Sequence, residues 1–163
     1  MFKNHTISIL VENKPGVLQK VTGLFTRRGF NIESITVGSS EVENLARMVI
    51  VVYADLKGLE QVKKQLNKLV DVIKVIELDP NSSVKRELCL IKVKTNDAKA
   101  RTEVMQYTEV FRCNIVDVCD HAITLEVIGH PNKINALIKL LKNYGIKKIA
   151  RTGPTAVSRG LVL

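Results

Sequence analysis

The chain has 163 residues, 45% of them hydrophobic, and a formal net charge of +9. This length allows one domain or two small ones, and the hydrophobic content excludes a disordered or collagen-like protein. The longest apolar run, Met48–Val52, is far shorter than the roughly 20 residues of a transmembrane helix, so we expect no membrane association. We find no signal-peptide pattern. The three cysteines form no Cys-x-x-Cys motif, so we expect neither a disulfide framework nor a structural zinc site. Both observations predict a cytoplasmic protein.

Positive charge is concentrated in the second half of the chain. Residues 1–79 carry a net charge of +2, and residues 80–163 carry +7. A basic half raises the question of nucleic acid or of an acidic partner. With 4% aromatic residues and no Trp, the chain has few platforms on which bases could stack. The composition therefore favours a solvated cationic surface, and we expect no nucleic acid as a partner.

Strand and helix patterns alternate in the first 79 residues. Asn13 suits a helix N-cap, Pro15 suits the first helical turn, and Gly29 suits the C-terminal cap of the same helix. Apolar periodicity predicts, in order, strand Thr6–Val11, helix Val17–Phe25, strands Ile32–Val37 and Arg47–Ala54, helix Leu59–Val70 and strand Val72–Leu78.

The same order returns after residues 80–84, which begin Pro-Asn-Ser-Ser and have the composition of a linker. The tail Leu161–Leu163 has little pattern of its own. The second set of patterns predicts strand Leu88–Val93, helix Ala100–Phe111, strands Ile115–Val118 and Ile123–Ile128, helix Pro131–Leu141 and strand Ile146–Ile149.

Two β-α-β-β-α-β units predict an α+β protein of two ferredoxin-like domains. Each domain would have a four-stranded antiparallel sheet with two helices on one face. The opposite face carries apolar side chains such as Leu10 and has no helix to cover it. Because exposed apolar faces and bare sheet edges are normally buried by a partner, we expect an oligomer, most simply a two-fold dimer.

We find no constellation of residues that indicates catalysis. The histidines His5, His121 and His130 are scattered and lack a carboxylate or second His at metal-ligand spacing, so we expect them to be polar surface residues. Cys89 lies within an apolar strand and is most simply a small core residue. No phosphate-binding, dinucleotide-binding or nucleophile-elbow glycine motif is present. The sequence therefore predicts no catalytic residue, no metal and no cofactor in this chain.

The strongest local signal is the segment Val11–Leu18, which reads Val-Glu-Asn-Lys-Pro-Gly-Val-Leu. Ordinary helix capping explains it, but so does ligand binding. A helix N-terminus offers unpaired N–H groups that suit a carboxylate, and Gly16 lets a ligand approach the backbone. Asn13 can both donate and accept hydrogen bonds. We expect Asn31, at the start of the next strand, to lie beside this loop, so that the two Asn side chains and the helix end would bind the polar end of an amino acid.

These residues resemble the ACT domain, a regulatory module that binds small molecules at a strand-to-helix loop. More closely, nearly the whole chain resembles the regulatory small subunits of acetohydroxyacid (acetolactate) synthase. The resemblance is carried by Val11–Leu18, Gly23–Phe25, Arg28–Ser34, Arg47–Met48, Gln65–Val72, Arg86–Leu88, Phe111–Arg112, Ile115–Val118, Ala150–Gly153 and Ser158–Gly160.

The resemblance implies an ACT domain over residues 1–79 and a C-terminal domain of similar topology over residues 85–163. It implies a homodimer through the ACT domains and a separate catalytic large subunit that holds thiamine diphosphate, Mg²⁺ and usually FAD. In this role the small subunit raises catalytic activity and confers feedback inhibition, with valine as the effector. Transferred by motif, the effector-binding residues are Asn13, Gly16, Val17, Leu18, Asn31 and Ile32.

Two other functions remain open at this point. One is a stand-alone amino-acid-sensing ACT protein that regulates another enzyme or a regulator. The other is an RNA-binding domain, because RNA-recognition motifs share the β-α-β-β-α-β order. Those motifs need several aromatic residues on the third strand, whereas Arg47–Tyr53 contains one.

Overall fold

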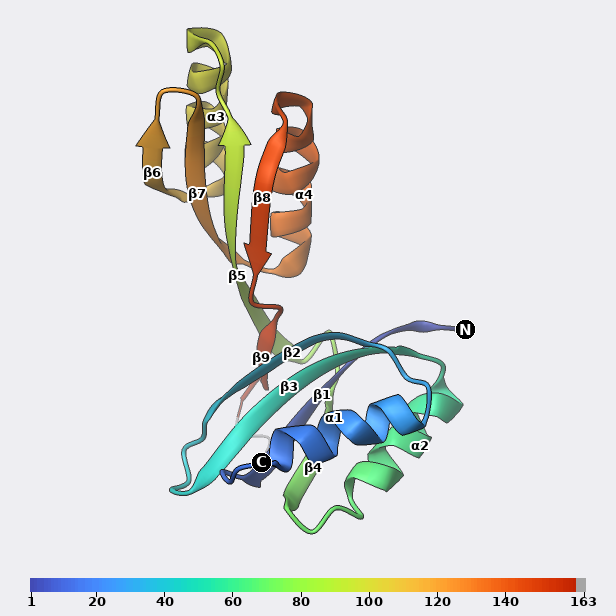
Figure 1. Ribbon diagram of the computed structural model, residues 1–163. Helices are drawn as coiled ribbons and strands as arrows, with labels where there is room; N and C mark the ends of the chain where they lie inside the picture. The colour runs from blue at the N-terminus through green and yellow to red at the C-terminus, as the bar shows by residue number, and fades with distance from the viewer. Residues whose placement is uncertain (161–163) are drawn as a thin grey trace. The chain divides into compact units, whose positions relative to one another are not determined.

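The computed structural model describes residues 1–160 (Figure 1). Contacts divide the described residues into two units, the first made of residues 1–84 and 155–160, the second of residues 85–154. Leu161–Leu163, predicted as the end of the second domain, lie outside the described residues. No helix within residues 1–160 is both long and apolar enough to cross a membrane.

The first unit has a four-stranded sheet in the order β2-β3-β1-β4, with every neighbouring pair antiparallel. Helices α1 and α2 lie on the same face of this sheet (Figure 1). This is the predicted ferredoxin-like arrangement. Its elements are β1 (Lys3–Glu12), α1 (Val17–Arg27), β2 (Ile32–Ser39), β3 (Leu45–Ala54), α2 (Leu56–Leu66) and β4 (Val72–Leu78).

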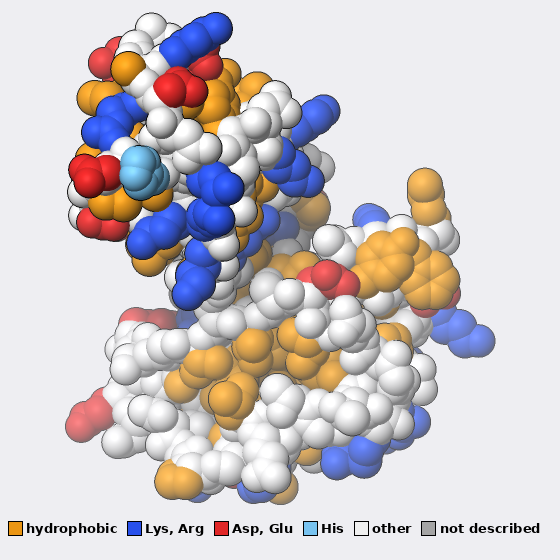
Figure 2. Space-filling model, turned by 45° about the horizontal axis from the view of Figure 1, so that its top comes forward, with side chains coloured by type: hydrophobic (Ala, Val, Ile, Leu, Met, Phe, Trp, Pro, Cys, Tyr) orange, Lys and Arg blue, Asp and Glu red, His pale blue; other side chains and the backbone are white. Residues whose placement is uncertain are grey.

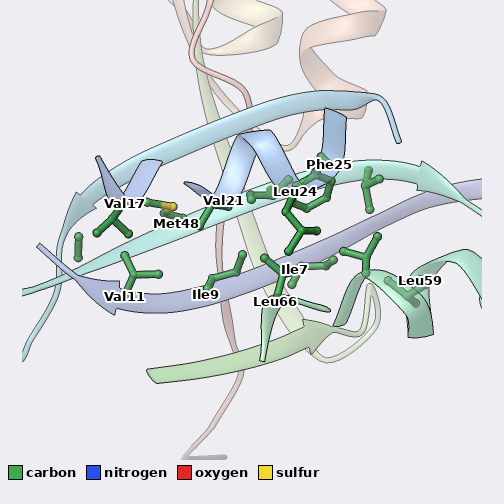
Figure 3. Close-up of a cluster of buried hydrophobic side chains, with 14 residues drawn as sticks. Ile7, Ile9, Val11, Val17, Val21, Leu24, Phe25, Met48, Leu59 and Leu66 are labelled. Carbon is green, nitrogen blue, oxygen red and sulfur yellow. The ribbon is translucent and has the colours of Figure 1, made fainter. Parts of the chain in front are cut away.

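Alternate residues of β1 build the first core. Ile7, Ile9 and Val11 are fully buried and pack against the apolar stripes of α1 and α2 (Figure 3). Phe25 of α1 is the largest fully buried side chain. Their alternate positions along β1 explain the orientation, because a slip of one residue would turn these three side chains away from the helices.

The ends of α1 are set by two glycines in left-handed conformations. At the C-terminal end, Gly29 has φ +69° and follows the C-cap Arg28, and the Phe30 N–H donates to the Phe25 carbonyl over 3.0 Å, as in a Schellman motif. At the N-terminal end, the N-cap is Gly16 at φ +85°, not Asn13. The predicted cap was wrong because Asn13–Gly16 forms a turn before the helix, which also leaves Pro15 outside the first helical turn.

The second unit repeats the arrangement, with strands in the order β6-β7-β5-β8 and α3 and α4 on one face (Figure 1). Its core includes Ile91, Leu125 and Leu137, all fully buried, and Cys89 is buried as predicted. Burial also raises the pKa of the Cys89 thiol. The elements are β5 (Ser83–Lys94), α3 (Ala98–Phe111), β6 (Asn114–Cys119), β7 (Ala122–Gly129), α4 (Pro131–Leu141), the 3-10 helix η1 (Lys142–Tyr144) and β8 (Ile146–Arg151).

One ion pair is buried in the second unit. Glu87 is 3% exposed, and both of its carboxylate oxygens accept hydrogen bonds from the Arg151 guanidinium, over 2.6 and 2.8 Å. The same contact raises the pKa of Arg151. A bidentate pair of this kind supplies the partner that a buried carboxylate requires.

The strand β9 (Thr155–Ser158) was not predicted, and its contacts differ from the predicted domain boundary. β9 pairs with β5, and Ala156 packs with Val49, Leu78 and Ile76 on the face of the first sheet that the helices leave open. The predicted second domain, residues 85–163, included this segment. The segment also covers part of the face that was expected to be bare. In addition, β5 begins at Ser83, inside the predicted linker.

Candidate functional site

The loop Asn13–Gly16 joins β1 to α1 and is exposed along its whole length. The Asn13 N–H donates to the Asn44 carbonyl over 2.8 Å, which fixes the loop to the β2–β3 hairpin. The Lys14 N–H donates to the Glu12 carbonyl over 3.1 Å, and the Lys14 ammonium forms an ion pair with the Glu12 carboxylate. That contact raises the pKa of Lys14. The loop is therefore held in one conformation although water reaches it.

The N-terminus of α1 has no side-chain cap. Gly16 has no side chain with which to accept a hydrogen bond, and the first turn contains no acidic residue. The first intrahelical bond is donated by the Lys20 N–H to the Gly16 carbonyl. The Val17 N–H donates to the Lys14 carbonyl over 3.4 Å, so the amides of Leu18 and Gln19, with the positive end of the helix dipole, are the ones available to an anionic group. A Cβ built at Gly16 would meet no atom within 4 Å, so the space beside Gly16 at this helix end is open.

Val17 and Leu18 have opposite environments. The Val17 side chain is 3% exposed and belongs to the core, so a ligand at the loop could contact only its backbone. Leu18 is 46% exposed and presents an apolar side chain beside the loop. Of the predicted residues, Asn13, Gly16, Val17 and Leu18 thus lie together in the structure.

Asn31 and Ile32 lie far from these four residues, so the expected position of Asn31 beside the loop was wrong. Ile32 pairs with Val52 of β3, and Val52 pairs with His5 near the start of β1. At a rise of about 3.3 Å per residue, the start of β2 lies roughly 25 Å along the strand direction from Asn13. β1 and β2 flank β3 and run in the same direction, so the two strand starts share one end of the sheet.

Two residues that the sequence did not mark as functional, Lys20 and Asp71, connect α1 to the end of β1 next to the loop. The Lys20 ammonium donates to the Asp71 carboxylate over 2.5 Å, and the Asp71 carbonyl accepts from the Glu12 N–H over 2.9 Å. The hydrogen bond from Lys20 lowers the pKa of Asp71. The pair therefore joins the first turns of α1 to the segment before β4. No local sequence pattern predicts this ion pair, because its two partners are 51 residues apart.

His5 is buried rather than on the surface, which corrects the prediction. It is 4% exposed, and its Nδ1 lies 3.3 Å from the Glu77 carboxylate of β4, which also contacts Lys63 of α2. Within residues 1–160, no three His, Cys, Asp or Glu side chains are grouped as a metal site requires.

Comparison with known proteins identifies the family. The family "AHAS small subunit-like ACT domain" matches residues 7–74, and "Small subunit of acetolactate synthase" matches residues 86–160. A Methanothermobacter thermautotrophicus protein named "Probable acetolactate synthase small subunit" is 60% identical over 156 residues, which cover 96% of this chain and 93% of that protein. The chain belongs to the acetolactate synthase small-subunit family. The resemblance found in the sequence is therefore confirmed.

Other family members support the same assignment. The "Acetolactate synthase small subunit" of Mycobacterium bovis is 50% identical over 158 residues, which cover 97% of this chain and 94% of that protein. The crystal structure of the small subunit from Thermotoga maritima superposes with a TM-score of 0.89 at 47% identity, covering 98% of this chain and 99% of that one. This match confirms the predicted pair of ferredoxin-like domains. A small subunit of acetolactate synthase is a regulatory chain of branched-chain amino acid biosynthesis, and it implies a catalytic large subunit.

The Lys20–Asp71 pair predicts a pH-dependent stability. Because the folded-state pKa of Asp71 is depressed, its contribution is complete above the ordinary Asp pKa of about 4 and is lost as the pH falls through the lower folded value. Lys20→Met should therefore lower the free energy of unfolding at neutral pH, and the difference from wild type should vanish in acid. Urea denaturation at about pH 7, 4 and 2.5 measures this.

Lys64→Met is the matched control, because Lys64 is an exposed helical lysine whose ammonium has no carboxylate within 4.0 Å among residues 1–160. It should have little effect at any of these pH values. A Lys20→Met destabilisation that persisted unchanged in acid would show that packing, not the ion pair, supports the loop.

Proposed function

We propose that this chain activates the catalytic subunit of acetolactate synthase and makes it sensitive to feedback inhibition by valine. The observation that supports this most directly is the exposed, uncapped N-terminus of α1 in an ACT domain of this family. Valine carries a carboxylate for the first-turn amides and an ammonium group for the Asn13 side-chain oxygen. The exposed Leu18 side chain would contact its isopropyl group.

The proposed effector site is shared between two copies of the chain. Asn31 and Ile32 are at the far end of the sheet from Asn13, so one copy cannot supply the whole set. β2 is an edge strand. If it pairs antiparallel with β2 of a second copy, the start of one β2 meets the Ser39 end of the other. Ser39 pairs with Ala46, which also pairs with Val11 beside the loop. A two-fold dimer through β2 would therefore bring the two parts together.

Catalysis and its cofactors are assigned to the partner. We assign thiamine diphosphate, Mg²⁺ and FAD to the catalytic subunit, and we assign the complex to the cytoplasm. On this view the small subunit binds the effector and favours one of two states of the complex, since a ligand can shift an equilibrium only by its difference in affinity for the two states.

The first test measures acetolactate formation. The purified chain alone, supplied with pyruvate, thiamine diphosphate, Mg²⁺ and FAD, should form none. Added to its catalytic subunit, it should raise the rate, and valine should lower that rate. Turnover by the chain alone, or a catalytic subunit that its addition leaves unchanged, would contradict the regulatory role.

The second test compares Gly16→Asp with Gly16→Asn. The two side chains have the same shape and tolerate a left-handed conformation similarly well, so the backbone cost at φ +85° is matched. Only Asp adds a negative charge where the valine carboxylate is expected. Two like charges about 4 Å apart repel by about 4 kcal/mol at an effective dielectric constant near 20, which is nearly three decades in affinity.

Valine inhibition of the reconstituted complex should therefore be much weaker with Gly16→Asp than with Gly16→Asn, while activation is similar for both. Thermal unfolding of the two variants checks that they are equally stable. If valine inhibits the complexes with Gly16→Asp and with Gly16→Asn equally, the added charge does not face the ligand, and the loop is not the effector site.

The third test addresses sharing of the site between copies. Gly16→Asp and Asn31→Ala chains carrying different tags are co-expressed, and the mixed dimer is isolated through both tags. If the site is shared, each mixed dimer contains one doubly altered site and one intact site, so part of the valine inhibition should return. A site formed within one chain leaves no intact site in the mixture, and inhibition would then stay as weak as in either variant alone.

A further inference from the structure

A hollow of about 410 Å³ lies on the open face of the first sheet, where β9 forms one of its walls. Its volume is in the range of small-molecule sites, roughly 300–1,000 Å³. Strands β1, β3 and β4 form its floor, and all of the residues that line it belong to the first unit. The loop Asn13–Gly16 does not line it. The hollow is therefore separate from the proposed effector site.

Hydrogen-bond donors from three neighbouring strands line this hollow. Leu10 of β1 pairs with Arg47 of β3 on one side and with Lys74 of β4 on the other, so the two cations flank it. Ser8, two residues before Leu10 on the same face of β1, is 3% exposed. The Arg47 guanidinium donates to the Ser8 Oγ over 3.3 Å. Within the described residues this is the one hydrogen bond of the Ser8 hydroxyl, whose own hydrogen remains to be donated.

The positive charge of the hollow is only partly neutralised. Among the described residues that line it, Glu41 is the one carboxylate, and it accepts from Arg47 over 2.7 Å. Lys74 has no carboxylate within 4.0 Å in residues 1–160. Two cations against one carboxylate leave a net positive charge next to the Ser8 hydroxyl. This part of the hollow therefore suits an anion that accepts hydrogen bonds.

The remaining wall of the hollow is apolar. Leu10, Ile76 and Leu78 come from the sheet, and Val157 comes from β9. An apolar group that covers this wall gains about 25 cal/mol for each Å² of apolar area taken out of water. Positive charge alone does not mark a site, because Lys and Arg side chains cover much of the visible surface of the second unit (Figure 2). A buried donor, two cations and an apolar wall in one hollow together do.

The lining selects among anions. Among the described residues no aromatic side chain lines the hollow, so the base of a nucleotide has no ring on which to stack. A free phosphate would leave the apolar wall in contact with water. An amino acid would bring an ammonium group beside Arg47 and Lys74, while the Glu41 carboxylate is already held by Arg47. A small carboxylate with an apolar body matches both parts of the hollow.

We infer that this hollow is a second ligand site of the first unit, which binds a small carboxylate that has an apolar body and no ammonium group. The carboxylate accepts hydrogen bonds from Ser8, Arg47 and Lys74, and the apolar body packs on Leu10 and Ile76. The inference goes beyond the proposed function, because it concerns another ligand at other residues and needs no catalytic subunit.

NMR titration of the full-length chain tests the choice of ligand. The probe is 3-methylbutanoate, which is valine without its ammonium group. Its matched comparisons are 3-methylbutan-1-ol, which lacks the charge, and inorganic phosphate, which lacks the apolar body. We expect 3-methylbutanoate to shift the amide signals of Ser8, Leu10 and Lys74. Each comparison compound should bind at least about tenfold more weakly, because it loses either the charged hydrogen bonds or the burial of apolar area.

Two variants test the residues of the hollow. Lys74→Glu places a carboxylate at the edge of the hollow, where it repels the ligand, and should weaken binding of 3-methylbutanoate at least about tenfold. Its matched control is Lys64→Glu, which changes the net charge equally on an exposed position of α2 and should bind like wild type. Ser8→Ala removes the buried hydroxyl and should weaken binding roughly fivefold. Thermal unfolding checks that the variants are folded.

The inference is overturned if wild type does not bind 3-methylbutanoate, or if wild type and Lys74→Glu bind it equally well. Tighter binding of inorganic phosphate or of ATP would show an anion site of another kind and would also overturn it. Excess valine should leave the affinity for 3-methylbutanoate unchanged. If Gly16→Asp weakens binding of 3-methylbutanoate and Lys74→Glu does not, the probe binds at the loop, and this inference fails while the proposed function stands.

Discussion

Both helices of each unit pack on the same face of their sheet, and the other structural features follow from this constraint. In the first unit it makes Ile7, Ile9 and Val11 core residues, and in the second it does the same for Cys89, Ile91 and Val93. One face and two edges of each sheet then remain without helix cover. The first sheet has β9 over part of its open face, and the second has the exposed side chains of Leu90, Lys92 and Ile128 there. Open faces and bare edges of this kind are normally buried by a partner.

The sequence allowed the order of strands and helices to be predicted because each core face has its own periodicity. It placed the first residue of α1 correctly at Val17 but not the N-cap, because Asn13, Pro15 and Gly16 fit a helix cap and a turn equally well, and only the left-handed Gly16 decides between them. β9 was missed for another reason. Four residues are too few for a pattern, and the contact of Ala156 with Val49 spans more than 100 residues. His5 looked exposed at a strand end, but it is buried and lies against Glu77 of β4, 72 residues away in the sequence.

The position of Asn31 shows how residue types can suggest a site whose geometry a single copy of the chain does not provide. Asn31 follows α1 closely in the sequence, but an 11-residue helix carries the chain back along the sheet. β3 then separates β2 from β1, so the register, rather than the sequence, sets the distance to Asn13. Residue types identified a plausible set of effector contacts. Only the strand pairing shows that one copy of the chain cannot supply all of them.

A site divided between copies would explain how a chain of this kind can regulate without performing chemistry. A ligand that needs Asn13 of one copy and Asn31 of the other binds only where two β2 edges have met, so its binding energy stabilises that arrangement over any other. The loop is suited to this because Lys20, Asp71 and Asn44 hold it in place before the ligand arrives, and little ordering entropy is then lost on binding.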